Sequence, residues 1–244
     1  MDQTLSIFLL ALGTALATGL GALPFLWMRN PSPRWIGVAN ALAAGLMIGA
    51  SVSLVLEGQH SSLPATLIGV GLGMAFILIT RKVLPDHDEL SIGGMKGLSA
   101  RRALLLFLVM TIHSFAEGVG VGVAFGGGQA IGLMIAIAIA VHNIPEGLAI
   151  SLTMVPRGTP VWKAALYSIA SSLPQPLMAV PAYWFVEQFR PALPVGLGFA
   201  AGAMIWMVFS ELLPESLKES HNARLTYGVT TLATFAMLAF TFML

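Results

Sequence analysis

The amino-acid sequence predicts an all-α membrane protein whose eight transmembrane helices form a three-two-three inverted-repeat arrangement. Composition is the first observation: 57% of the 244 residues are hydrophobic and 9% are charged, whereas soluble domains carry roughly 25% charged residues. Secondly, the apolar residues fall into eight runs, each close to the roughly 20 residues that span a bilayer as a helix. Thirdly, two segments recur in spans of opposite direction, as in inverted-repeat transporters.

The breaks between the apolar runs contain turn-forming and charged residues, such as the prolines between Arg29 and Arg34 and the glycines at 126–128. The break at Glu57–Ser62 is the least marked, because the following run is rich in glycine. We expect one transmembrane domain over residues 1–244, with spans at about 4–27, 35–57, 63–84, 103–125, 130–154, 164–186, 195–216 and 225–244.

One connection is long, at about 85–102, and we expect it on the cytoplasmic side. It contains Asp86-His87-Asp88-Glu89 followed by glycines. This segment is either a solvated linker or a loop that binds and delivers metal weakly, since one imidazole and three carboxylates can hold a cation.

Lysine and arginine are distributed unequally over the expected loops, and cytoplasmic loops carry the excess of these residues. We therefore expect a multi-pass protein of the plasma (inner) membrane with both termini extracellular or periplasmic. In this orientation the outer loops hold only Arg190, and the inner loops hold Arg29, Arg34, Arg81, Lys82, Lys96, Arg101, Arg102, Arg157, Lys163, Lys218 and Arg224. The net charge is +1, without a basic tract that would indicate nucleic-acid binding.

Two pairs of spans contain similar segments. An Ala-Ala-Gly-x-Met segment occurs at 43–47 in the second span and at 200–204 in the seventh. A His-x-x-x-Glu-Gly segment occurs at 113–118 in the fourth span and at 142–147 in the fifth. Both pairs run in opposite senses, which indicates three helices, a central antiparallel pair and three further helices.

The paired histidines and glutamates are the strongest candidates for a functional site. Ionisable groups inside a membrane helix cost roughly 2.5–3.5 kcal/mol each. Residues four apart share one helix face, so His113 projects with Glu117, and His142 with Glu146. Two packed antiparallel helices can bring all four groups together, and imidazoles with carboxylates are ligands for Zn²⁺. The chain has no cysteine that could supply a thiolate.

Other candidates are less specific. A lone buried histidine is more often a hydrogen-bonded structural residue, and a methionine such as Met47 usually packs in an apolar helix. Glu211, next to Ser210, fits an exit-path ligand and an interfacial anchor equally well. Pro145, Pro174 and Pro176 interrupt the backbone hydrogen bonding of their helices, which indicates a locally unwound, polar centre.

Together these features resemble the ZIP family of divalent-metal transporters, in particular its short GufA-like bacterial branch. The resemblance covers essentially the whole chain and rests on the paired His-x-x-x-Glu-Gly segments, the eight expected spans and the Ala-Ala-Gly-x-Met segments. It implies uptake of a divalent metal ion, above all Zn²⁺, into the cytoplasm, with Fe²⁺, Mn²⁺, Cd²⁺ and Co²⁺ as further candidate substrates. It also implies movement of a transport unit against a scaffold and, in many members, a homodimer.

The resemblance implies a binuclear centre between the fourth and fifth spans. The first metal would use His113, Glu117, His142 and Glu146, with Met47 nearby, and Glu211 would lie on the cytoplasmic exit route. A second would use Ser114, Glu117, Asn143, Glu146 and Gln175. Related chains often carry asparagine at the position of Ser114 and a carboxylate at that of Gln175, so we expect one strong site and a second that is weak or absent.

Three rival interpretations stay open at this point. An intramembrane metal-dependent hydrolase also needs His and Glu ligands, with a general base in addition. A haem-binding electron carrier would use paired axial histidines. A passive metal channel differs from a transporter only in its kinetics, because its flux does not saturate.

Overall fold

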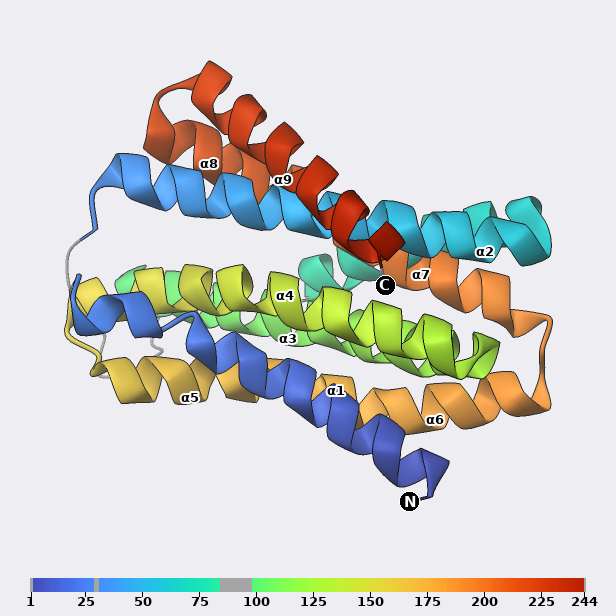
Figure 1. The fold of residues 1–244 in the computed structure, drawn as a ribbon. Coiled ribbons are helices and arrows are strands. Elements are labelled where there is room, and N and C mark those ends of the chain that lie inside the picture. The colour runs from blue at the N-terminus through green and yellow to red at the C-terminus, as the bar shows by residue number, and fades with distance from the viewer. Residues whose placement is uncertain (1, 29–30, 84–97, 244) are drawn as a thin grey trace.

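The computed structural model describes residues 2–28, 31–83 and 98–243 (Figure 1). All regular secondary structure in these ranges is helical, which confirms the all-α prediction. Within these ranges six segments are long and apolar enough to cross a membrane, as a multi-pass membrane protein requires. The acidic segment expected in the long loop, residues 86–89, lies outside the described residues.

The helices begin and end at residues suited to those positions. Asp2 caps the first helix by accepting a hydrogen bond from the Thr4 amide, Gly128 has a φ of 145° at the turn between α3 and α4, and Pro174 is the first residue of α6. In chain order the elements are α1 (Gln3–Leu20), η1 (Leu23–Leu26), α2 (Pro33–Val83), α3 (Leu98–Gly127), α4 (Gln129–Met154), η2 (Val155–Arg157), α5 (Val161–Ser172), α6 (Pro174–Gln188), α7 (Ala192–Met207), η3 (Val208–Leu212), α8 (Leu213–Ser220) and α9 (Ala223–Met243).

The element α2 consists of two helical stretches, because the chain reverses direction at Ser62, whose backbone angles (φ −168°, ψ 106°) are not helical. A Cβ at Gly58 would lie 2.7 Å from the Thr66 hydroxyl. In a straight helix these two residues would be roughly 12 Å apart. The chain therefore folds back within one element. The break expected at Glu57–Ser62 is thus present, but only Ser62 departs from helical backbone angles.

The helices are arranged in two groups (Figure 1). In the first group, α1, α3, α4, α5 and α6 pack on one another, and in the second, α2 packs with α7, α8 and α9. The groups meet mainly where α3 contacts α7 and α2 contacts α4. The metal-ligand candidates of α3 and α4 therefore belong to the first group.

Facing glycines bring the second half of α2 against α7. A methyl group at Gly69 or Gly73 would overlap the backbone of α7, and one at Gly198 or Gly202 would overlap the backbone of α2. Each helix thus carries two glycines four residues apart, the spacing that allows close helix contact in membranes. This contact holds the second half of α2, after the reversal, against α7.

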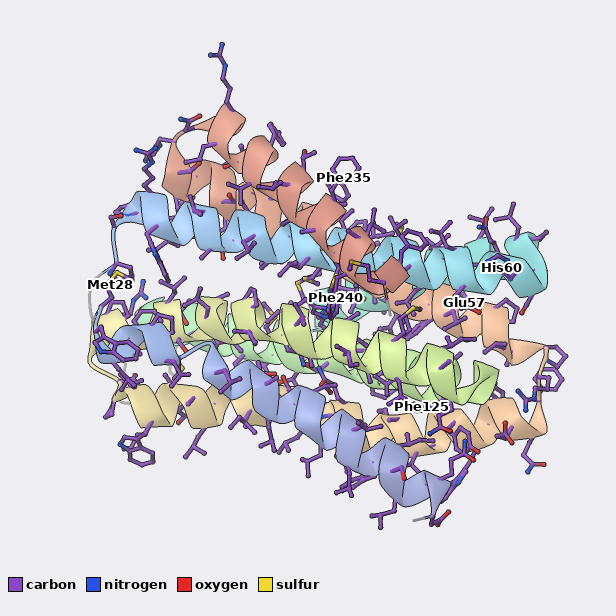
Figure 2. All side chains as sticks on the ribbon, viewed as in Figure 1. Met28, Glu57, His60, Phe125, Phe235 and Phe240 are labelled. Atoms are coloured by element: carbon purple, nitrogen blue, oxygen red, sulfur yellow. The ribbon has the colours of Figure 1, made fainter. Side chains whose placement is uncertain are left out.

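Large apolar side chains cover much of the outside. Phe235 points outward from α9 in Figure 2 and is 65% exposed, and Phe242 on the same helix is 74% exposed. Soluble monomers rarely expose large contiguous apolar patches, whereas lipid accepts such a surface. His113 and Glu117 are by contrast fully buried.

Candidate metal centre

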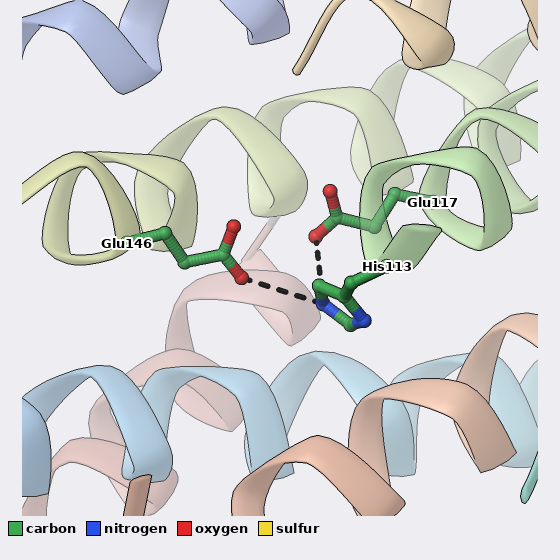
Figure 3. Close-up of side chains that lie close together, drawn as sticks. All are labelled: His113, Glu117 and Glu146. Carbon is green, nitrogen blue, oxygen red and sulfur yellow. Dashed lines mark ion pairs between the residues drawn. The ribbon is translucent and has the colours of Figure 1, made fainter. Parts of the chain in front are cut away.

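Helices α3 and α4 bring four ionisable side chains into one buried volume. His113 and Glu117 lie one turn apart on α3, and His142 and Glu146 lie one turn apart on α4. At most 2% of each residue is exposed. Figure 3 shows His113 between the two glutamates, which approach it from different helices. The two His-x-x-x-Glu segments therefore lie side by side, and ligand atoms of His113, Glu117 and Glu146 all lie within 4.8 Å of one another. Their role as metal ligands, and that of His142, stays a prediction.

The nitrogen–oxygen separations around His113 suit a small cation, whereas those around His142 do not. His113 Nε2 is 3.3 Å from Glu117 Oε1 and 3.4 Å from Glu146 Oε1. His142 Nε2 is 3.9 Å from Glu146 Oε1 and 2.6 Å from Glu117 Oε1. Ligands about 2.0–2.2 Å from a tetrahedral Zn²⁺ are roughly 3.3–3.6 Å apart. The 2.6 Å separation is that of a hydrogen bond, so His142 Nε2 and Glu117 Oε1 would have to move apart to share a cation.

Several polar atoms around this cluster are buried without a hydrogen-bond partner among the described residues. They are His113 Nδ1 and Nε2, His142 Nδ1, Glu146 Oε1, Ser114 Oγ and Asn143 Oδ1. Buried polar groups in proteins are nearly always hydrogen-bonded, so a concentration of unpaired ones needs an explanation. A cation held by His113 Nε2 and Glu146 Oε1 would give two of these atoms a partner.

A chain of hydrogen bonds from α1, α4 and α6 ends on Glu117. Gln175 Nε2 on α6 donates to Glu117 Oε2 at 2.5 Å. Gln175 Oε1 accepts from the Thr14 hydroxyl of α1 at 2.6 Å and from Asn143 Nδ2 at 3.1 Å. The structure thus brings the predicted residues Asn143 and Gln175 next to the cluster. Thr14 is a member that the sequence interpretation missed, and its only sequence signal is a hydroxyl within an apolar run.

The glycine after each glutamate admits a neighbouring helix. A Cβ at Gly118 would lie 2.5 Å from the Gln175 carbonyl oxygen of α6, and one at Gly147 would overlap the Thr18 carbonyl oxygen of α1. The two repeated segments therefore have the same packing role. Gly118 lets α6 pack closely on α3, and Gly147 lets α1 pack closely on α4. Close approach at Gly118 is what brings Gln175 within reach of Glu117.

The other predicted residues are Ser114, Met47 and Glu211. Ser114 is buried on α3, one residue after His113, and Met47 is fully buried on α2. Glu211 is half-buried on η3, a π-helical turn just before Pro214, whose ring nitrogen cannot donate to the carbonyl of Ser210. Roles for Met47 and Glu211 stay predictions. Helix α4 continues unbroken past Pro145, whereas the chain does break between α5 and α6 at Leu173, before Pro174.

Comparison with known proteins gives consistent results. Residues 86–244 match the family described as ZIP zinc transporter. The chain is 34% identical to zinc transporter ZIPB of Bordetella bronchiseptica over 92% of its own length and 76% of that protein. It is also 34% identical to zinc transporter GufA of Myxococcus xanthus, over 87% of its own length and 89% of that protein.

A plant protein is more similar in sequence but much longer. The chain is 45% identical to an Arabidopsis thaliana protein that carries a provisional zinc-transporter name, over 93% of the chain. It spans only 37% of the length of that relative. The similarity therefore concerns one part of the plant protein, whereas it covers most of the two bacterial ones.

Proposed function

Because this chain belongs to the ZIP family of zinc transporters, we propose that it carries Zn²⁺ across the plasma membrane into the cytoplasm. The ion would bind between α3 and α4 to His113, Glu117, His142 and Glu146. The observation that carries the proposal is the convergence of two imidazole nitrogens and two carboxylate oxygens in one fully buried volume. Zn²⁺ accepts this ligand set, and family membership favours transport over the hydrolase alternative.

The expected path through the membrane has eight crossings. Of the six apolar segments, α2 supplies two crossings because it reverses at Ser62. Helices α5 and α6 together supply one further crossing, which is broken at Leu173. The α4–α5 and α8–α9 connections lie at one end of the molecule, and the α3–α4 and α6–α7 connections lie at the other (Figure 1). The first end is rich in lysine and arginine, which supports its placement in the cytoplasm.

Single cysteines introduced into this chain, which has none, will show which side of the membrane each position faces. We expect Ser61→Cys, at the bend of α2, to react with a membrane-impermeant maleimide in right-side-out vesicles. Ser32→Cys, before the start of α2, should react only after the membrane is opened. Both side chains are exposed. Equal labelling of the two positions in sealed vesicles would contradict the double crossing of α2.

The two helix groups also suit a transport cycle in which one moves against the other. The first group contains every proposed ligand except Met47 and Glu211. At the boundary, Gly120 of α3 faces Ala200 of α7, and Gly196 of α7 faces Val123 of α3. Small residues of this kind allow one helix to slide past another with little interlocking. Met47 on α2 and Glu211 on η3 would then contact the ion at particular stages of the cycle.

Zinc uptake into liposomes tests the proposed function. Purified protein is reconstituted with a zinc-sensitive dye inside, and wild type should show saturable uptake. His113→Ala and Glu146→Ala each remove a ligand, and we expect at least about a 100-fold loss, since even outer-shell changes cost 10- to 100-fold. The control is His221→Asn at the α8–α9 turn, where asparagine tolerates the φ of 49°. Wild-type uptake by both ligand variants would refute the site.

A further inference from the structure

The two oxygens of Glu117 face different surroundings. Oε1 lies 2.6 Å from His142 Nε2 and 3.3 Å from His113 Nε2, on the side where the imidazoles converge. Oε2 accepts the hydrogen bond from Gln175 Nε2. All four residues are fully buried, so water does not compete for either oxygen. Each oxygen is therefore committed to a different partner.

The direction of the Gln175 amide is fixed from the backbone of α1. The Thr14 carbonyl oxygen can only accept, so the Asn143 atom 2.8 Å away is its NH₂ group. That NH₂ group also donates to Gln175 at 3.1 Å, so the Gln175 atom there is an oxygen. The opposite end of the Gln175 side chain is then its NH₂ group, and it faces Glu117. The reverse orientation would set two NH₂ groups against each other and an amide oxygen against a carboxylate.

The same side of Glu117 offers little to a cation. Apart from the two glutamates, the groups predicted there are the hydroxyl of Ser114 and the amides of Asn143 and Gln175, which are all neutral. The NH₂ group of Gln175 has no lone pair for a metal. A cation on Oε2 would have to displace this donor without gaining a further negative charge. In a low-dielectric interior an uncompensated charge is strongly unfavourable.

We propose that Gln175 is a positioning residue that limits the centre to one divalent cation per chain. Held by Thr14 and Asn143, it keeps Glu117 Oε1 directed at the imidazoles and occupies Oε2 with an amide donor where a second ion would need to bind. This inference rests on the proposed function, because it takes the cluster to be a Zn²⁺ site. Its new content is how Gln175 limits the number of ions, and the part of α1 in holding Gln175.

The number of bound Zn²⁺ ions tests this assignment. The purified full chain is dialysed against buffered Zn²⁺ in detergent, and protein and metal are quantified together. We expect one ion per chain for wild type and two for Gln175→Glu, which has the same shape and adds a carboxylate. Thr14→Val, which removes one hydrogen bond to Gln175, should keep one ion but bind it about fivefold to tenfold more weakly. Thr18→Val is the matched control, because the Thr18 hydroxyl pairs with Ser172 instead.

The outcomes separate this inference from the proposed function. Two ions of similar affinity on the wild-type chain would overturn the inference while leaving zinc transport intact. So would a folded Gln175→Glu protein, as judged by gel filtration, that still binds one ion. If Gln175→Glu does not fold, two other measurements test the inference. They are the number of Zn²⁺ ions bound by the wild-type chain and the difference in Zn²⁺ affinity between Thr14→Val and Thr18→Val. A wild-type chain that neither binds nor transports Zn²⁺ would overturn the proposed function, and the inference with it.

Discussion

Glu117→Gln is expected to reduce Zn²⁺ uptake at least about 100-fold, to the level of liposomes without protein. Glu117 Oε1 approaches both imidazoles, and Oε2 accepts the hydrogen bond from Gln175. Glutamine keeps the shape but removes the negative charge that offsets the ion. It also replaces one oxygen by an NH₂ group, which cannot bind a metal. Even changes beyond the direct ligands cost 10- to 100-fold in metal affinity, so the loss of this ligand should exceed that range.

Initial uptake rates in liposomes, corrected for the amount of protein incorporated, provide the measurement. Glu215→Gln is the matched control. The Glu215 side chain is 48% exposed and pairs with Lys218 on the surface, where such a pair contributes little. We expect this variant to transport at the wild-type rate. If Glu117→Gln retained more than about a tenth of wild-type uptake, Glu117 could not be a ligand shared by both helices.

The second large effect is expected from one methyl group at Gly147. A Cβ there would overlap the Thr18 carbonyl oxygen, and a Cβ at Gly21 would overlap the backbone of α4 near Leu148. Because backbone atoms cannot rotate out of the way, Gly147→Ala must push α1 away from α4. Overpacking of this kind costs typically about 1–3 kcal/mol. It would also carry Thr14 away from Asn143, so uptake should fall together with stability.

Gly13→Ala is the control for this prediction. Gly13 also lies on α1, but a Cβ there meets no atom within 4 Å. Alanine in a helix is favoured over glycine by about 0.5–1 kcal/mol, so this variant should unfold at the same or a slightly higher temperature. Thermal unfolding in detergent, followed by gel filtration, compares the two variants. If Gly147→Ala were as stable and as active as Gly13→Ala, the close crossing of α1 and α4 would be wrong.

The centre of the molecule could be predicted well from residue spacing. The i, i+4 relation places His113 with Glu117 and His142 with Glu146 on their helix faces, and antiparallel packing allows the two pairs to meet. Family resemblance supplied Gln175 and Asn143 as neighbours. It could not give the direction of their amides, which depends on the Thr14 carbonyl of another helix. Thr14 itself was missed because a single threonine in an apolar run carries no pattern.

Other features depend on contacts that a single segment does not contain. The reversal at Ser62 lies within the break predicted at Glu57–Ser62, two residues before Pro64, but the close packing of the following half of α2 against α7 could not be read from that segment alone. The π-helical turn at Glu211 follows from Pro214, whose effect on the preceding turn could have been foreseen. The eight crossings, the orientation and a homodimer remain predictions. The all-helical fold and ZIP family membership are confirmed.

The pairing of glycines between α2 and α7 has a consequence for biosynthesis. The chain is made from its N-terminus, and 125 residues separate Gly73 from Gly198. At about 5–20 residues per second, translation of that stretch takes roughly 6–25 s. During this time the face of α2 at Gly69 and Gly73 lacks the α7 backbone that packs on it in the finished structure. Assembly of the second half of the protein is thus a condition for completing the first.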